Sequence, residues 1–184
     1  MAIYPIIQLP DVRLRVATAA ITVFDAALQQ LIDDMFETMY AAKGIGLAAP
    51  QIAISKKLAV IDVSNNKSTT WCLINPIIID KKGEELMEEG CLSVPGIYDK
   101  APRALWVKLR ALDRHGKPYE LEAEDLLAHC IQHEVDHLNG KLFLDHLSPL
   151  KRQLARKKLE KIKKRGKSWT LFLQAPLNLQ CLVC

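Results

Sequence analysis

Apolar residues recur at helical spacing in three stretches of the chain. In residues 25–42 they are Leu28, Leu31, Ile32, Met35, Phe36 and Met39, and Gly44 follows as a terminator. In residues 124–139 they are Leu127, Ile131, Val135 and Leu138, and Gly140 follows. After Pro149 they are Leu150, Leu154, Leu159 and Ile162, set among basic residues. The pattern predicts two amphipathic helices in the body of the protein and a basic amphipathic helix that packs against it.

Four shorter segments are rich in β-forming residues and are separated by turn residues such as His115-Gly116. They are residues 58–63, 71–80, 105–112 and 119–123, and the last two are expected to form a hairpin. The strands are grouped apart from the helices and do not alternate with them. This order predicts an α+β fold in which largely antiparallel sheets pack around a central helix, residues 124–139.

The composition excludes a disordered chain and a multi-span membrane protein, since 49% of the 184 residues are hydrophobic and 25% are charged. The net charge of +4 is unevenly distributed. Residues 151–167 hold ten Lys and Arg against one acid, Glu160, so the first 150 residues are slightly acidic. We expect a single domain over residues 1–150, the basic helix over 151–167, and an apolar tail over 168–184. The tail is too short and interrupted to span a bilayer, and both disorder and packing against a neighbour stay open for it.

Cysteine usage and the N-terminus indicate a reducing cytoplasm. The five cysteines are an odd number at irregular spacing. The first residues include prolines and Asp11, where a signal peptide needs an apolar run. We therefore expect a cytoplasmic protein with free thiols.

Residues 133–137 read HEVDH on the predicted central helix. Two histidines four residues apart share a face and lie about 6 Å apart along the axis, so both can bind one metal ion while Glu134 reaches water on that ion. The pattern predicts His133 and His137 as ligands and Glu134 as the general base. Surface histidines are the alternative, and the apolar character of the helix argues against it.

His129 extends the row to three histidines. The outer two lie about 12 Å apart along the helix, too far to share a metal with ligand bonds of about 2 Å. Only two neighbouring histidines of this row can bind the same metal ion. Glu134 is part of the HEVDH segment with His133 and His137, so these two are the predicted pair. Two interpretations of His129 stay open, a wall of the substrate pocket and a hydrogen-bonded core histidine.

A hydrolytic metal site needs three protein ligands and one open position. The third histidine of the metzincin pattern would fall at Phe143, which excludes that pattern, and a downstream carboxylate would have to be Glu160 in the basic segment. Cys91 remains, in a polar, glycine-containing turn over residues 88–93. A thiolate with two imidazoles suits Zn²⁺ or Fe²⁺. An ordinary half-buried cysteine is the alternative for this residue.

Residues 44–49 match the weak dinucleotide pattern GxGxxA, but they follow a helix and run into Pro50. That motif must follow a strand and open a helix, so the interpretation is rejected. The glycines are better suited to let the backbone approach a substrate, with Gln51 as an amide donor. A plain loop with a surface glutamine is the alternative.

Three segments, KGIGLAAPQ, EEGCLSVPG and QHEVDHLNG, resemble in order and spacing the three motifs of bacterial peptide deformylases. The similarity covers roughly the first 165 residues. It implies a metal-dependent hydrolase that removes the formyl group from the N-terminal formyl-methionine of new polypeptides and releases formate. It also implies one divalent ion per chain, Fe²⁺ in the cell, which Zn²⁺, Ni²⁺ or Co²⁺ can replace.

The motif positions carry the family's site residues over to this sequence. The implied metal ligands are Cys91, His133 and His137. The implied catalytic groups are Glu134, the amide of Gln51 and the backbone N–H of Leu92. Substrate backbone is expected along Ile45 and Gly46, and the candidate walls of the methionine pocket are Leu126, His129 and Cys130. Because the position of His129 is often apolar in the family, we expect a more polar pocket or a weaker preference for methionine.

Partners and rival functions follow from the same features. The resemblance implies formyl-methionyl nascent peptides as substrates and a ribosome contact through residues 151–167, with a solvated basic face as the alternative. We expect a monomer that binds neither DNA nor a membrane. The rival functions are a metallopeptidase that uses Glu160 and a non-catalytic, metal-stabilised module whose basic segment contacts RNA.

Overall fold

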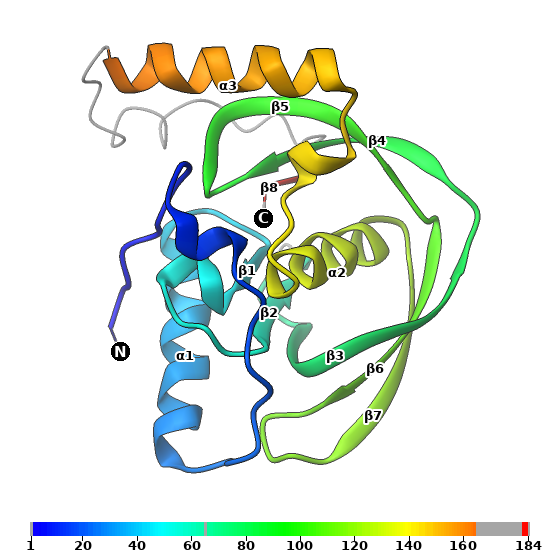
Figure 1. Ribbon diagram of the computed structural model, residues 1–184. Helices are drawn as coiled ribbons and strands as arrows, with labels where there is room; N and C mark the ends of the chain where they lie inside the picture. The colour runs from blue at the N-terminus through cyan, green and yellow to red at the C-terminus, as the bar shows by residue number, and fades with distance from the viewer. Residues whose placement is uncertain (1, 65, 165–181, 184) are drawn as a thin grey trace.

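The computed structural model describes residues 2–64, 66–164 and 182–183, and it shows one helix lying between two sheets (Figure 1). This central helix is α2 (Asp125–Leu138). Both sides of α2 are covered, so its three histidines are buried together with its apolar residues. The predicted α+β class with a central helix is confirmed.

The larger sheet has five strands, and all of its neighbours are antiparallel. In spatial order they are β1 (Gly46–Ala48), β2 (Leu58–Asp62), β3 (Thr70–Lys82), β6 (Trp106–Leu112) and β7 (Pro118–Glu124). Strands β6 and β7 form the expected hairpin. The buried side of this sheet packs on α2 through residues such as Leu73, Leu109 and Ile131.

The smaller sheet has three strands, in the order β5 (Val94–Arg103), β4 (Glu85–Cys91) and β8 (Leu182–Val183). The prediction of a polar turn over residues 88–93 is wrong, because β4 continues to Cys91 and leaves only two residues before β5. Antiparallel pairing with β5 stabilises this charged segment as a strand. Residues 86 and 88 point to solvent while residues 89–91 are buried, so the strand could not be predicted from the local composition of the segment.

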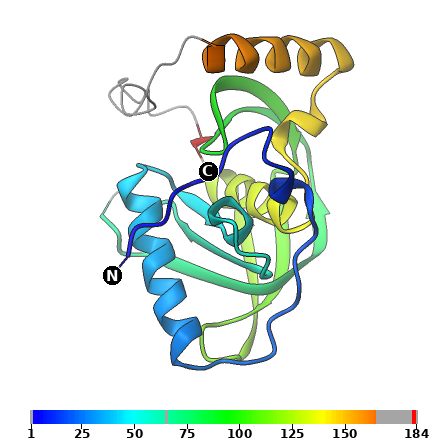
Figure 2. The ribbon, with the colours of Figure 1, turned by 60° about the vertical axis from the view of Figure 1, so that its left-hand side comes forward.

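Helix α1 (Ala26–Ala41) begins where the sequence predicts, because the Asp25 side chain accepts a hydrogen bond from the Leu28 N–H at 2.9 Å. Its apolar face, including Ile32 and Met35, packs against β1 and β2. Figure 2 shows α1 along one flank of the molecule. Short 3₁₀ turns lie at η1 (Val12–Arg15), η2 (Ala49–Ile52) and η3 (Phe143–His146).

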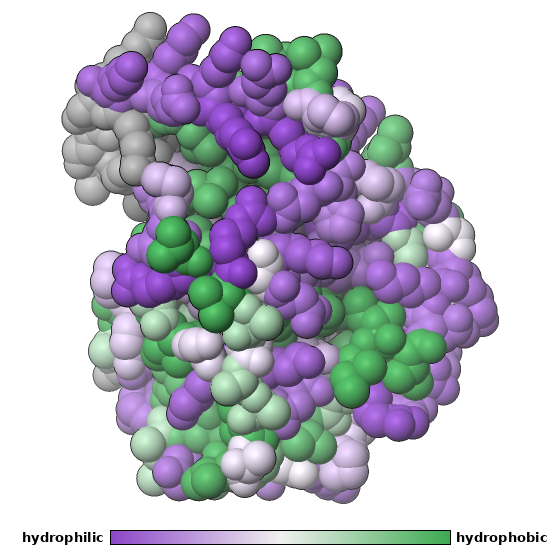
Figure 3. Space-filling view, viewed as in Figure 1, coloured by the Kyte–Doolittle hydropathy of each residue, from purple (hydrophilic) through white to green (hydrophobic). Residues whose placement is uncertain are grey.

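Helix α3 (Pro149–Lys164) is the predicted basic helix, and it begins two residues earlier than expected. Ala155 and Leu159 pack against the smaller sheet and η3. The outer surface over α3 is largely hydrophilic (Figure 3). Residues 165–167 of the predicted basic segment lie outside the described residues, as does the predicted tail over 168–184 apart from β8. None of the helices described combines the length and the apolar character that crossing a bilayer requires.

Candidate active site

Cys91, His133 and His137 come together between β4 and α2. Cys91 ends β4, and the two histidines lie one turn apart on α2. All three are buried, and one ligand atom from each lies within 4.8 Å of the others. Cys91 Sγ lies 3.2 Å from His137 Nε2. Glu160, the ligand of the rival metallopeptidase, is exposed on α3.

The protonation of these groups suits a divalent ion. His133 Nδ1 lies 2.9 Å from Glu89 Oε2, and a carboxylate there favours an Nδ1–H, which leaves a lone pair on Nε2. That Nε2 is buried without a hydrogen-bond partner among the described residues. Burial, followed by the neighbouring charge of His133, lowers the pKa of His137 well below its usual value and keeps the ring neutral. A thiol and two imidazoles therefore fit an ion such as Zn²⁺ or Fe²⁺.

The Cys91 thiol is held protonated by its surroundings unless a cation is near. Burial raises its pKa, and hydrogen bonds from the backbone of Ser93 and Val94 oppose that rise only in part. A coordinated metal ion deprotonates a thiol outright. The thiolate form of Cys91 thus depends on a cation between it and the two histidines.

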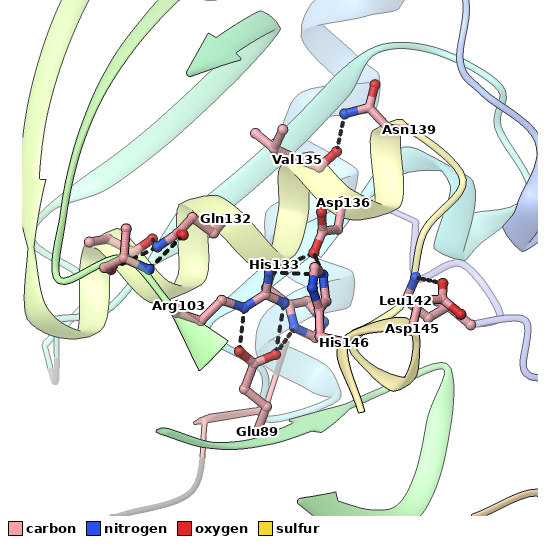
Figure 4. Close-up of polar contacts among 12 residues, drawn as sticks. Glu89, Arg103, Gln132, His133, Val135, Asp136, Asn139, Leu142, Asp145 and His146 are labelled. Atoms are coloured by element: carbon pink, nitrogen blue, oxygen red, sulfur yellow. Dashed lines mark hydrogen bonds and ion pairs between the residues drawn. The ribbon is translucent and has the colours of Figure 1, made fainter. Parts of the chain in front are cut away.

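A buried network of charges holds His133 in place (Figure 4). Glu89 is fully buried and accepts two hydrogen bonds from Arg103, Nε to Oε1 at 2.6 Å and Nη2 to Oε2 at 3.0 Å. Arg103 Nη1 also donates to Asp136 Oδ2 at 2.6 Å, and His146 Nε2 lies 2.7 Å from the same oxygen. Burial would raise the pKa of Glu89, but the hydrogen bonds from His133 and Arg103 lower it to about 2. Glu89 is therefore an anion that fixes the tautomer of His133, one of the three candidate metal ligands.

The roles of Glu89 and Arg103 are not predicted from the sequence. One signal for Glu89 was present, because residues two apart in a strand point to the same face and Glu89 lies two before Cys91. That signal required recognising β4 as a strand. The sequence contains no such signal for Arg103, because its place opposite Glu89 comes from the pairing of β4 with β5 and from the packing of α2 beside them.

Glu134 is fully buried on α2, against the backbone of β1. A Cβ added at Gly46 would lie 2.4 Å from Glu134 Oε1 and 2.7 Å from Cys130 Sγ. Only a glycine therefore lets β1 approach this carboxylate so closely. The residue predicted as the general base thus lies next to the candidate metal ligands and beside an edge strand.

Gln51 is fully buried in η2, which rules out the surface glutamine considered from the sequence. Its Oε1 accepts a hydrogen bond from the Ala48 N–H at 2.7 Å, and this orients the amide. Its Nε2 then faces Cys91, 3.8 Å from Sγ. Leu92, the other predicted donor, lies in the two-residue turn directly after Cys91.

The N-terminal segment braces both of these elements. The Ile7 N–H donates to the Gln51 carbonyl at 2.8 Å, and the Leu9 N–H donates to the Ser93 carbonyl at 3.0 Å. Backbone pairing thus ties η2 and the turn after Cys91 to one extended stretch of chain. Neither residue was singled out from the sequence.

The residues expected to bind the substrate side chain have different surroundings. Cys130 is buried, and its Sγ contacts the Ile45 carbonyl at 3.7 Å. Leu126 is 37% exposed near the start of α2. His129 is fully buried, with Nε2 3.0 Å from Glu85 Oε1 and with burial lowering its pKa. His129 is therefore a hydrogen-bonded buried histidine, and it is not part of the group of Cys91, His133 and His137 that could hold a metal ion.

The chain was compared with known proteins. A family model for polypeptide deformylases matches residues 3–153. A peptide deformylase of Chromobacterium violaceum is 56% identical over 166 residues, which cover 90% of this chain and 99% of the relative. A peptide deformylase of Tolumonas auensis is 55% identical, with 88% of this chain and 97% of the relative covered. The crystal structure of a peptide deformylase from Legionella pneumophila has a TM-score of 0.86 at 54% identity and covers 91% of this chain and 100% of that chain. The matched region contains β1, the turn after β4 and α2, and the chain belongs to the polypeptide deformylase family.

Proposed function

We propose that this deformylase removes the N-formyl group of newly made polypeptides with Cys91, His133 and His137 as ligands of one divalent ion. The observation that carries the proposal is the group of three ligand atoms within 4.8 Å of one another, next to the buried carboxylate of Glu134. We assign the catalytic unit to residues 1–150. Three protein ligands leave a position open for the reaction.

We propose Fe²⁺ as the ion in the cell, with Zn²⁺, Ni²⁺ or Co²⁺ able to replace it. A thiolate with two imidazoles suits all of these ions. When bound, the ion supplies a Lewis acid that polarises the formyl group and lowers the pKa of water toward about 7.

Glu134 is assigned the proton transfer. Its carboxylate accepts a proton from the attacking water and gives it to the nitrogen of the leaving amine, so a C–O bond forms, the formyl C–N bond breaks, and formate leaves. Its burial against Gly46 keeps the carboxylate close to a substrate that lies along β1. Removing the carboxylate should therefore slow the reaction without removing a metal ligand.

Gln51 and Leu92 are assigned to the formyl oxygen. The Gln51 amide is oriented by its bond from Ala48, and its Nε2 faces the ligand group. Leu92, whose backbone N–H is the second donor, follows Cys91 directly, so both donors lie next to this proposed metal ligand. Fixed donors stabilise negative charge on an oxygen as it develops.

The substrate is assigned to the edge strand β1 and to a pocket that we propose beside it on α2. The backbone at Ile45 and Gly46 is the proposed contact for an extended peptide, and the methionine side chain is assigned to Leu126, His129 and Cys130. The pair of His129 with Glu85 supplies a polar group near this pocket. We expect it to weaken the discrimination between methionine and more polar side chains.

The test is anaerobic purification with metal analysis, followed by formate release from a formyl-methionyl peptide. We expect about one ion per chain and turnover, and Cys91→Ala should lose both. A metal-loaded protein that releases no formate would favour the rival binding module. Metal and turnover that survive Cys91→Ala would overturn the assigned ligand set.

We propose in addition that α3 brings this enzyme to the ribosome, as a cytoplasmic monomer. Ala155 and Leu159 face the body of the protein, whereas lysines on the remaining surface of α3 are exposed. Four of them are Lys157, Lys158, Lys161 and Lys164. Basic side chains bind RNA phosphates in a salt-dependent manner.

Reversing these four lysines to glutamate should weaken co-sedimentation with ribosomes at low salt while activity on short formyl peptides is kept. The matched control reverses four exposed lysines elsewhere, namely Lys56, Lys81, Lys100 and Lys117. Equal losses in the two variants would show that only net charge matters. Equal co-sedimentation of the α3 variant and the unmodified protein would exclude α3 as the contact.

A further inference from the structure

A strand from the C-terminal end of the chain lies on the edge of β4. Strand β8 pairs with β4 in parallel, with Leu182 opposite Glu89 and Val183 opposite Gly90. The other edge of β4 is taken by β5. Among the described residues, the edge that carries β8 is thus the one left for any further strand.

This edge leads directly to the proposed reaction centre. Gly90, the partner of Val183, immediately precedes the metal ligand Cys91, and Leu92 follows. Figure 1 shows β8 below β4, on the side toward α2 and β1. A polypeptide that extends away from the site along β4 must use the backbone groups that β8 now pairs with.

We propose that β8 is an intramolecular competitor of the extended substrate at this edge of β4. Docking by strand addition relies on main-chain hydrogen bonds and therefore accepts many sequences. That property suits an enzyme whose substrates share little beyond their first residue. The inference rests on the proposed function, because it takes the formyl end of the substrate to lie at Leu92.

The direction of β8 separates blocking from hydrolysis. Strand β8 runs parallel to β4, so its chain advances toward Cys91. A substrate that starts at Leu92 and leads away from the metal ligands must run antiparallel to β4. Strand β8 therefore covers the same edge in the opposite direction and presents no N-terminal formyl group to Glu134.

A tethered strand of this size is a weak competitor. Two segments of one chain can meet at effective concentrations in the millimolar range, and an intrinsic dissociation constant of similar size leaves the edge occupied about half of the time. Releasing β8 should then lower KM by roughly twofold, and by up to about tenfold if the strand binds more tightly, with kcat unchanged.

The test compares two full-length variants under reducing conditions. Leu182→Pro with Val183→Pro removes both backbone N–H groups of β8, whereas Leu182→Ala with Val183→Ala keeps them. We expect the proline variant, but not the alanine variant, to show the lower KM for a formyl-methionyl peptide. A synthetic peptide of residues 177–184 should compete with substrate on the proline variant.

Amide hydrogen exchange of β4 provides a readout that does not depend on turnover. Faster exchange at Gly90 and its neighbours in the proline variant alone would support pairing with β8. Equal exchange and equal KM in the two variants would overturn the inference while leaving the proposed function intact. If neither metal-loaded variant releases formate, the proposed function fails, and the exchange still decides whether β8 covers the edge.

Discussion

Arg103→Met tests the buried network that positions His133. The substitution keeps a long apolar side chain but removes the guanidinium that bridges Glu89 and Asp136. The side chains of Arg103 and Glu89 are 3% and 0% exposed, so water cannot replace the lost hydrogen bonds. Glu89 would remain a buried carboxylate with His133 as its remaining partner in this network.

The expected loss follows from that unpaired charge. Breaking a buried ion pair by removing one partner costs about 3–5 kcal/mol. For a chain of this length, each kcal/mol corresponds to roughly 2–4 °C, so Tm should fall by roughly 6–20 °C. Metal affinity should fall by about 10- to 100-fold as well, because Glu89 orients a ligand.

Thermal unfolding is measured with and without a chelator, so that lost metal is not mistaken for lost packing. The matched control is Arg110→Met, which breaks an ion pair with Glu120 whose side chains are 60% and 43% exposed. Exposed pairs contribute little, and Tm should hardly change. Equal shifts for the two variants would refute the reasoning.

A second variant separates charge from shape. Adding Glu89→Gln to Arg103→Met removes the stranded carboxylate, so the double variant should recover part of the lost Tm without recovering metal affinity. A double variant that unfolds at a still lower temperature would show that packing, and not the unpaired charge, dominates.

Three further outcomes are expected at the site itself. Glu134→Gln should keep the metal and lose at least about 10²-fold in kcat, whereas the exposed control Glu122→Gln should match the unmodified enzyme. Near-normal formate release by the Glu134→Gln variant would contradict the assignment of Glu134 as the general base. Gln51→Leu should lower kcat by about 10²- to 10³-fold at unchanged metal content, and a change confined to KM would make it a binding residue. Gly46→Ala should lower activity, because the added Cβ forces β1 away from Glu134. A crystal structure of this variant in which β1 has not moved would contradict this explanation.

The sequence was most informative where the functional residues lie together in one secondary-structure element. The helix bearing His133 and His137 is readable from apolar spacing, and the four-residue step places both rings on one face. Cys91 was reached by elimination, although the strand that presents it was taken for a turn. The residues before it are largely charged, and pairing with β5 stabilises them as a strand.

Contacts between distant segments were beyond the reach of local patterns. Glu89 and Arg103 meet because two strands and a helix converge, and no spacing in the chain encodes that distance. The pairing of β8 with β4 depends likewise on tertiary structure. Chemistry within one helix could thus be predicted, whereas the residues that tune it through space could not.

The backbone bonds from Ile7 to Gln51 and from Leu9 to Ser93 have a consequence for how this enzyme is made. At about 5–20 residues per second, a ribosome places Ser93 roughly 4–17 s after Leu9, and His137 later still. The first residues to emerge from the ribosome therefore cannot form these hydrogen bonds until their partner residues have been synthesised. An enzyme that processes emerging chains is itself incomplete until its own earliest residues have docked on segments synthesised several seconds afterwards.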